Sequence, residues 1–178
     1  MGGKDQKPRK RRPPTPATIA VLIFVLLAVL RIAVFRPELA SDGKPRSKAV
    51  VQHVIDGDTF VLDDGRHVRM LGIDAPEAGF GNKPREDFSA EATDWLRERI
   101  EGREVELRID YPKTDRYGRT LAWVFEADGT LVNQRMLSAG RVKLLAAFGL
   151  PVDLEPTLRQ AESEARIRRI GLWAPRKK

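Results

Sequence analysis

The pattern of apolar and polar residues divides the chain into an apolar run near the N-terminus and a longer body of short apolar stretches separated by charged turns. In the body, residues 49–55, 59–62 and 67–73 alternate or cluster β-branched and apolar side chains, which is typical of strands. The residues 63–65, Asp-Asp-Gly, form a hairpin-turn sequence between the last two stretches. The pattern therefore predicts three consecutive antiparallel strands.

Helical spacing appears after a loop rich in Gly, Pro and charge at residues 78–87. Ser89 is expected to cap a helix whose apolar residues recur at helical spacing until Gly102 ends it. The rest of the body predicts strands at 104–109 and 121–125, a short helix at 131–139, an extended segment at 141–147 and a last helix at about 157–169. Five strands and three helices indicate a mainly β, α+β fold. They are compatible with a five-stranded Greek-key barrel of the oligonucleotide-binding (OB) type, although periodicity alone does not choose it over another α+β arrangement.

The N-terminal region has the features of a membrane-directed segment. A basic stretch at residues 1–16 precedes an apolar segment at 17–36, which is long enough to span a hydrocarbon core of about 30 Å if Arg31 snorkels. The positive-inside rule then places the N-terminus in the cytoplasm and the body on the extracytoplasmic side. A cleaved secretory signal is the alternative, but Glu38-Leu39-Ala40 is a poor cleavage site.

The same pattern of apolar, basic and turn residues predicts the domain boundaries. A transmembrane helix at 17–36 is followed by a linker at 37–47, a folded domain at 48–174 and a basic tail at 175–178. The net charge of +7 belongs to the two ends, since residues 1–47 hold ten Lys or Arg against three Asp or Glu. The folded domain is slightly acidic, so any attraction for a polyanion must come from a local patch. The chain has no cysteine, which excludes disulfides and thiolate metal sites.

Acidic residues at predicted strand ends are the first candidates for chemistry. Asp58 and Asp74 each lie where neighbouring strands can bring carboxylates together, and oxygen ligands without His or Cys favour Ca²⁺ or Mg²⁺ over Zn²⁺. Glu77 follows a proline three residues after Asp74, which makes it a candidate general base. An ordinary Asp-Gly-Asp turn at 56–58 is the simpler alternative for the first aspartate.

Two arginines are candidates for binding a phosphate. Arg69 lies on a predicted strand and Arg119 follows the turn Tyr117-Gly118, and two guanidinium groups can neutralise the charge that develops during phosphoryl transfer. Either could instead be a surface charge. His53 and His67 are too isolated for a histidine-based nuclease or zinc site and are expected to be ordinary strand residues.

Four segments, in order, resemble the staphylococcal nuclease (thermonuclease) family. They are Val54-Ile55-Asp56-Gly57-Asp58-Thr59, the run from Arg69 to Glu77, Asp115-Arg116-Tyr117-Gly118-Arg119, and Gly171-Leu172-Trp173. The resemblance covers nearly all of residues 48–174. It implies an OB-fold barrel with three helices and hydrolysis of DNA and RNA with little sequence preference, single-stranded or melted substrate being favoured. A monomeric protein and products with 3′-phosphate ends are also expected.

The resemblance also implies roles for individual residues. One Ca²⁺ would be held by Asp58, Asp74 and the main-chain carbonyl of Ala75, which replaces a threonine of the best-known members. Glu77 would activate the water, and Arg69 with Arg119 would grip the scissile phosphate. The residues expected to bind substrate are Lys83, Arg116, Tyr117 and Phe148.

The main departure from the family is at a base-contacting segment. Ala146 and Phe148 stand where the best-studied members have two tyrosines, and only Phe148 can stack on a base. Stacking is worth about 1–3 kcal/mol per base, so weaker binding or a different end preference is expected. A local basic patch is expected from Lys83, Arg85, Lys113 and Arg116. A non-catalytic nucleic-acid- or protein-binding barrel is the alternative function, which the retained acidic residues argue against.

Overall fold

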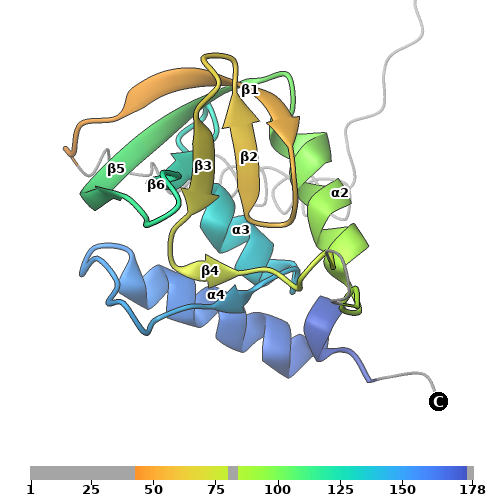
Figure 1. Cartoon of the computed structure of the whole chain (residues 1–178). Helices are drawn as coiled ribbons and strands as arrows, with labels where there is room; N and C mark the ends of the chain where they lie inside the picture. Colours follow the sequence, from red (N-terminus) through yellow and green to blue (C-terminus); the bar gives the residue numbers. More distant parts are fainter. Residues whose placement is uncertain (1–42, 80–83, 176–178) are drawn as a thin grey trace, which may run out of the picture. The chain divides into compact units, whose positions relative to one another are not determined.

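The computed structural model describes residues 43–79 and 84–175. Five strands close into a barrel in the order β1-β2-β3-β6-β5, with β5 pairing back to β1 (Figure 1). All neighbours are antiparallel except β3 and β6, which are parallel. The strands are β1 (Ser47–Val54), β2 (Thr59–Leu62), β3 (His67–Met70), β5 (Glu104–Thr114) and β6 (Thr120–Phe125). The predicted five-stranded barrel is confirmed.

Three α-helices and a small second sheet complete the described part of the chain. The helices are α2 (Ser89–Ile100), α3 (Val132–Ser138) and α4 (Glu155–Arg168), followed by a 3₁₀ turn, η1 (Gly171–Trp173). The second sheet pairs β4 (Ile73–Asp74) with β7 (Lys143–Leu144), and Figure 1 shows it between the barrel and α4. The extended segment predicted at 141–147 is therefore regular only over the two residues of β7.

The stretch predicted as one strand at residues 67–73 is broken in two. Gly72 has a left-handed backbone conformation, with φ of 68°, which a strand residue does not adopt. The chain leaves the barrel there and enters the second sheet at Ile73. This break carries Asp74 away from the barrel wall and toward the loops that surround its end.

The predicted helix cap at Ser89 is wrong. Ser89 is the first residue of α2, and the residue before it, Phe88, has φ of 68° and makes no side-chain capping bond. The hydroxyl of Ser89 instead accepts a hydrogen bond from Nε of Arg85 at 2.7 Å. The local sequence suggested a cap, but the loop before the helix supplies the hydroxyl with a different donor.

The barrel interior is packed with apolar side chains that come from all five strands. Phe60, Met70, Trp123 and Phe125 are among the largest that are fully buried. Burial of such a side chain contributes about 1.5–3 kcal/mol, so the barrel provides a rigid frame for the loops at its end. Arg108 is a charged residue within the barrel, and its side chain is only 1% exposed.

The predicted membrane segment at 17–36 lies outside the described residues. Within residues 43–79 and 84–175, no helix is long and apolar enough to cross a membrane.

Candidate active site

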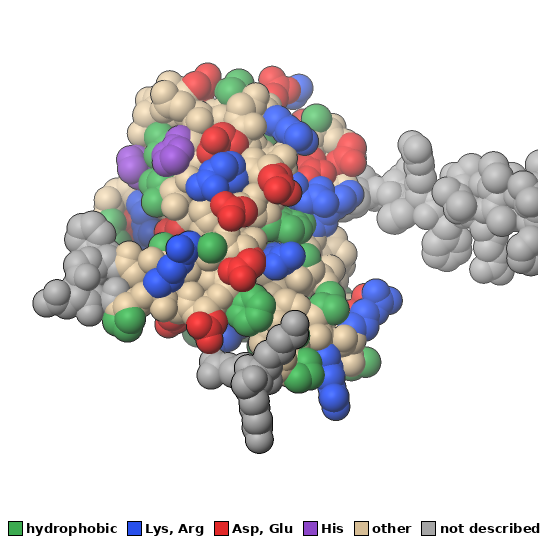
Figure 2. Space-filling model, turned by 90° about the vertical axis from the view of Figure 1, so that its right-hand side faces the viewer, with side chains coloured by type: hydrophobic (Ala, Val, Ile, Leu, Met, Phe, Trp, Pro, Cys, Tyr) green, Lys and Arg blue, Asp and Glu red, His purple; other side chains and the backbone are tan. Residues whose placement is uncertain are grey.

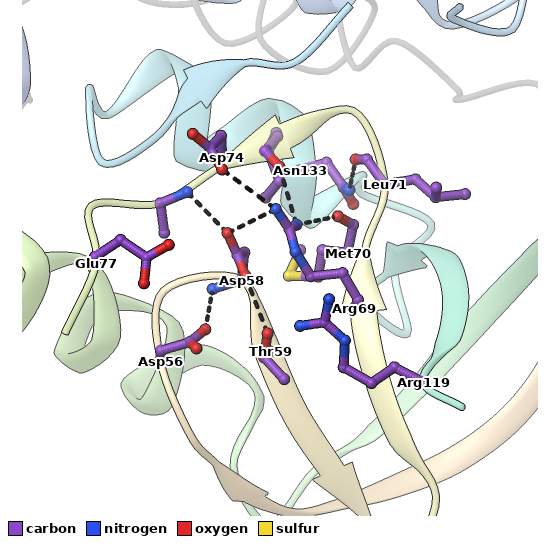
Figure 3. A network of polar contacts seen from close by, with 12 residues as sticks. Asp56, Asp58, Thr59, Arg69, Met70, Leu71, Asp74, Glu77, Arg119 and Asn133 are labelled. Atoms are coloured by element: carbon purple, nitrogen blue, oxygen red, sulfur yellow. Dashed lines mark hydrogen bonds and ion pairs between the residues drawn. The ribbon is translucent and has the colours of Figure 1, made fainter. Parts of the chain in front are cut away.

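The turn between β1 and β2 uses its two aspartates for different purposes. The carboxylate of Asp56 accepts a hydrogen bond from the backbone N–H of Asp58 at 3.0 Å, which closes the turn. Asp58 is then free to point its own carboxylate away from the turn and into the site (Figure 3). The simple-turn interpretation of Asp56-Gly57-Asp58 therefore describes Asp56 and not Asp58.

Gly57 lets this turn approach its neighbours closely. A Cβ atom at position 57 would lie 2.7 Å from the Cβ of Ala75 and 2.8 Å from the Cβ of Ala92. Such distances are shorter than van der Waals contact, so only glycine fits here without movement. The turn is thereby packed directly against α2 and against the segment that follows β4.

The carboxylate of Asp58 is nearly buried and is held by three groups. One oxygen accepts the backbone N–H of Ala75 at 2.8 Å and lies 3.0 Å from Nη2 of Arg69, while the other accepts the hydroxyl of Thr59 at 3.0 Å. Only 9% of the Asp58 side chain is exposed. These contacts fix the position of the carboxylate before any ligand arrives.

Arg69 connects the two predicted metal ligands. Its Nη2 lies 3.0 Å from Asp58 and 3.4 Å from Asp74, and its Nη1 donates to the carbonyls of Met70 and Ile73 (Figure 3). The guanidinium is therefore oriented by the backbone on one side and by the two carboxylates on the other. The sequence indicated that Arg69 could bind a phosphate. It did not indicate that Arg69 would also form ion pairs with Asp58 and Asp74.

Burial governs the charge state of Asp58. Loss of water raises the pKa of its carboxyl well above the ordinary value of 3.8; Arg69 opposes this, and the nearby Asp56 carboxylate adds to it. A carboxylate in this setting gains from a further positive charge beside it. Asp74 differs, because 57% of its side chain is exposed.

A buried amide from α3 supports the segment that carries these groups. Asn133 is fully buried; its Nδ2 donates to the carbonyl of Leu71 at 2.8 Å, and its Oδ1 accepts from the backbone of Val124 at 3.0 Å. The bend between β3 and β4 is thus tied to both α3 and β6. Sequence reasoning missed Asn133, because a single Asn in a helical pattern gives no signal of a partner 62 residues away.

Arg119 is positioned by an aspartate in its own turn. Oδ2 of Asp115 accepts from Nε of Arg119 at 2.7 Å, and Oδ1 accepts from the backbone N–H groups of Tyr117 and Arg119. Burial opposes the charge on Asp115, but the bonds from Arg119 and the backbone outweigh it and lower its pKa. The Asp-x-x-Gly turn sequence was the signal that could have identified Asp115.

All five residues predicted to do the chemistry line one cavity. Its volume is about 220 Å³, and Glu77 and Arg119 extend into it from opposite sides in Figure 3. Glu77 is exposed and lies on the segment that follows β4, directly after Pro76. The lining residues are Asp56, Asp58, Arg69, Asp74, Ala75, Pro76, Glu77, Ala78 and Arg119.

The cavity opens beside a larger cleft, with which it shares Arg69 and Arg119. The cleft has a volume of about 1060 Å³ and is also lined by the predicted substrate-binding residues Arg116, Tyr117 and Phe148. Lys83 lies outside the described residues. Arg85, predicted for the basic patch, lines a different cavity of about 480 Å³ that touches Asp74, Ala75 and Pro76.

The surface does not carry a broad basic patch on the face seen in Figure 2. Acidic and basic side chains are interspersed there, which agrees with the slightly acidic charge of the folded domain. The arginines that line the cavity and the neighbouring cleft are Arg69, Arg116 and Arg119.

The donor set suits a hard divalent cation. Oxygens of Asp58 and Asp74 converge on the same cationic nitrogen of Arg69, so the site already attracts positive charge. In the described part of the chain, no three His, Cys, Asp or Glu side chains are grouped to hold a metal. Backbone carbonyls and water would have to supply the other ligands, which is common for Ca²⁺ and Mg²⁺ and rare for Zn²⁺.

Comparison with known proteins identifies relatives of the whole domain. A family model described as "Staphylococcal nuclease homologue" matches residues 67–175. The "Thermonuclease" of Staphylococcus intermedius is 34% identical over 165 residues, covering 88% of this chain and 96% of that protein, and the "Thermonuclease" of Staphylococcus hyicus is 29% identical over 165 residues, covering 86% and 95%.

A fungal relative shares the domain in a longer chain. The "Probable endonuclease lcl3" of Botryotinia fuckeliana is 40% identical over 120 residues, which is 63% of this chain and 44% of the fungal protein. This chain thus spans less than half of that relative. The matched family, the two bacterial relatives and the closed barrel agree, and the chain therefore belongs to the staphylococcal nuclease family of phosphodiester hydrolases.

Proposed function

We propose that this protein hydrolyses phosphodiester bonds in DNA and RNA with little sequence preference, depends on Ca²⁺ and leaves 3′-phosphate ends. One observation carries the proposal: two aspartates, a glutamate and two arginines from four separate segments line a single cavity of about 220 Å³. Relatives named thermonuclease and endonuclease support the reaction class. None of the described residues that line the cavity is His or Cys, in keeping with an oxygen-ligated cation.

The side chains can be assigned to a balanced hydrolysis. Glu77 accepts a proton from a water molecule whose oxygen attacks phosphorus, and the bond from phosphorus to the 5′-oxygen breaks. The departing 5′-oxygen takes up a proton from solvent water and leaves as a hydroxyl, so the phosphate stays on the 3′ side. Arg69 and Arg119 stabilise the negative charge that accumulates on the phosphoryl oxygens.

The cation would be held by Asp58 and Asp74, with the carbonyl of Ala75 as the proposed third protein ligand. When bound, Ca²⁺ supplies positive charge that polarises the phosphate and the attacking water. Asp115 holds Arg119 and the backbone holds Arg69, so both guanidinium groups are oriented before substrate binds. This arrangement lowers the reorganisation required in the transition state.

The test is digestion of single-stranded DNA by the full chain in detergent, with Ca²⁺ and with chelator. Glu77→Gln should lower kcat by about 10²–10⁴-fold, the usual contribution of a general base, with little change in Tm. Glu91→Gln, a matched change at an exposed position of α2, should leave kcat unchanged. The ends can be identified by whether a phosphatase is needed before 3′ extension.

Two results would contradict the proposal. Equal cleavage by wild type and Glu77→Gln would remove Glu77 from the reaction. Tight binding of DNA in chelator, with no cleavage at any Ca²⁺ concentration, would instead indicate the non-catalytic binding module.

We also propose that residues 17–36 anchor the protein in a membrane with the nuclease domain on the extracytoplasmic side. The apolar run and the basic residues before it support this. Proteolysis of intact spheroplasts should digest the domain while leaving a cytoplasmic marker whole. Recovery of the domain in the soluble medium, with a new N-terminus after residue 36, would support signal cleavage instead.

A further inference from the structure

The exposed aromatic residues of the described chain gather at one place. Three large aromatic side chains are exposed to solvent: Tyr111, Tyr117 and Phe148. All three line the cleft of about 1060 Å³ beside the catalytic cavity. The other large apolar residues that are exposed in the described chain are Val or Ile, and none of them lines this cleft. Aromatic side chains left in water at the same cleft indicate a ligand with flat faces.

Tyr111 is the most exposed of the three, at 95%, and the resemblance to the family gave it no role. Its neighbour Asp110 is firmly held, because the carboxylate accepts Nε1 of Trp123 at 2.9 Å and Nη2 of Arg108 at 3.3 Å. The backbone that carries Tyr111 is therefore fixed while its ring extends into solvent. A ring on a fixed backbone loses little freedom when it stacks on a ligand.

Phe148 is carried by the loop between β7 and α4, which is linked to the same arginine. Asp153 in this loop accepts Nη1 of Arg108 at 2.6 Å, so one buried guanidinium joins the strand that bears Tyr111 to the loop that bears Phe148. Figure 1 shows that loop below the free end of β5, on the same side of the molecule. The two rings thus come from two separate walls of one cleft.

We propose that Tyr111 is a base-stacking residue, which contacts from the β5 wall the same bound strand that Phe148 contacts from the loop wall. The proposal rests on the proposed nuclease function and specifies how its substrate is recognised. Arg116 and Arg119 line the same cleft and supply cations for the phosphates between the bases. A base can offer its face to a ring only when it is unstacked from its neighbours, so the cleft selects single strands over duplex.

The experiment measures binding of a fluorescent oligothymidylate to the full chain in detergent with chelator present, so that binding is measured whether or not the protein cleaves. Tyr111→Ala should raise Kd about fivefold or more, the range expected for loss of one stacked base. Tyr111→Phe should bind like wild type, because it keeps the ring. Val152→Ala, at an equally exposed apolar residue outside the cleft, should also have no effect.

An abasic oligonucleotide of the same length separates stacking from phosphate contact. Tyr111→Ala should bind it as wild type does, since it offers no face for stacking. Kd for oligothymidylate within twofold of wild type would overturn the proposal, and so would an equal loss on both oligonucleotides. Absence of cleavage with Ca²⁺ would count against the proposed function alone, because the binding comparison does not depend on it.

Discussion

The catalytic cavity and the neighbouring cleft are built on opposite plans. In the cavity, Asp58 and Arg69 are largely buried, and the side chains of Asp58, Arg69 and Arg119 are each tied to backbone or to another side chain. In the cleft, Tyr111 and Phe148 are 95% and 88% exposed. The buried carboxylate and the two guanidinium groups are fixed in advance, whereas the aromatic residues proposed to stack on bases are left open. Changes in the first region should affect kcat, and changes in the second should affect KM.

A large difference in kcat is expected between Arg119→Lys in the cavity and the same change in the cleft. Lysine cannot keep both the bond to Asp115 and a second donor toward the cavity, so kcat should fall by about 10²–10³-fold. Arg116→Lys is the matched change in the cleft and should alter kcat less than threefold. Steady-state kinetics on single-stranded DNA measures both. Equal losses in kcat would erase the distinction between the two regions.

Asp153→Asn tests the link behind the cleft. Burial disfavours the charge on Asp153, but bonds from Arg108 and Lys44 outweigh it and lower its pKa to about 2. The stability that these bonds provide is complete at pH values above the unfolded-state pKa of Asp153, near 3.8. It is lost as the pH falls toward the folded-state pKa of about 2.

The variant should therefore unfold at lower denaturant concentration at pH 7, by about 2 kcal/mol, the value of a charged hydrogen bond. Its stability should also depend less on pH between 4 and 2. Denaturant unfolding at several pH values measures both. A wild-type pH dependence in the variant would show that Asp153 is not the group responsible.

Asp58→Asn should separate stability from function within the cavity. The carboxylate is buried near Asp56, and its raised pKa means that its charged form destabilises the fold at pH 7. In chelator the variant should be more stable by about 1 kcal/mol, while its Ca²⁺-dependent activity is lost. Asp74→Asn, at a half-exposed side chain, should lose activity without the gain in Tm. A lower Tm for Asp58→Asn would show that its bonds to Arg69 and Ala75 outweigh the burial.

The smallest effect concerns salt. The cleft and cavity present three arginines, Arg69, Arg116 and Arg119, and the folded domain is slightly acidic. With about 0.7 counterion released per contact on a single strand, the logarithm of the binding constant should fall with the logarithm of salt concentration with a slope of about −2. Fluorescence titration at several salt concentrations measures it. A slope steeper than about −5 would require a basic surface beyond these residues.

The sequence predicted the barrel well because its evidence was local. Alternating apolar residues, Asp-Gly turns and glycine helix ends each act within a few positions, and the strands and helices they predicted were found. The failures also have local causes. Gly72 splits one predicted strand, and Ser89 gives its hydroxyl to Arg85 rather than to the helix.

The residues proposed to take part in the reaction could be predicted from the sequence, but the residues that hold them and the cleft in position could not. Charged side chains in recognisable segments marked Glu77 and Arg119, and the structure places them at one cavity. Asn133 and the pair of Arg108 with Asp153 act between segments that are distant in sequence, so no single stretch reveals them. Tyr111 was missed for another reason: its role depends on which wall of the cleft β5 forms.

Gly57 gives the site a weakness that involves no charge. The turn bearing Asp58 rests against the methyl groups of Ala75 and Ala92, and there is no room for even one more carbon. A methyl group added at Gly57 would clash with these two side chains and move the Asp58 carboxylate away from the backbone N–H of Ala75 that holds it. A substitution of Gly57 should therefore impair this nuclease by steric conflict alone, although Gly57 neither binds substrate nor takes part in the reaction.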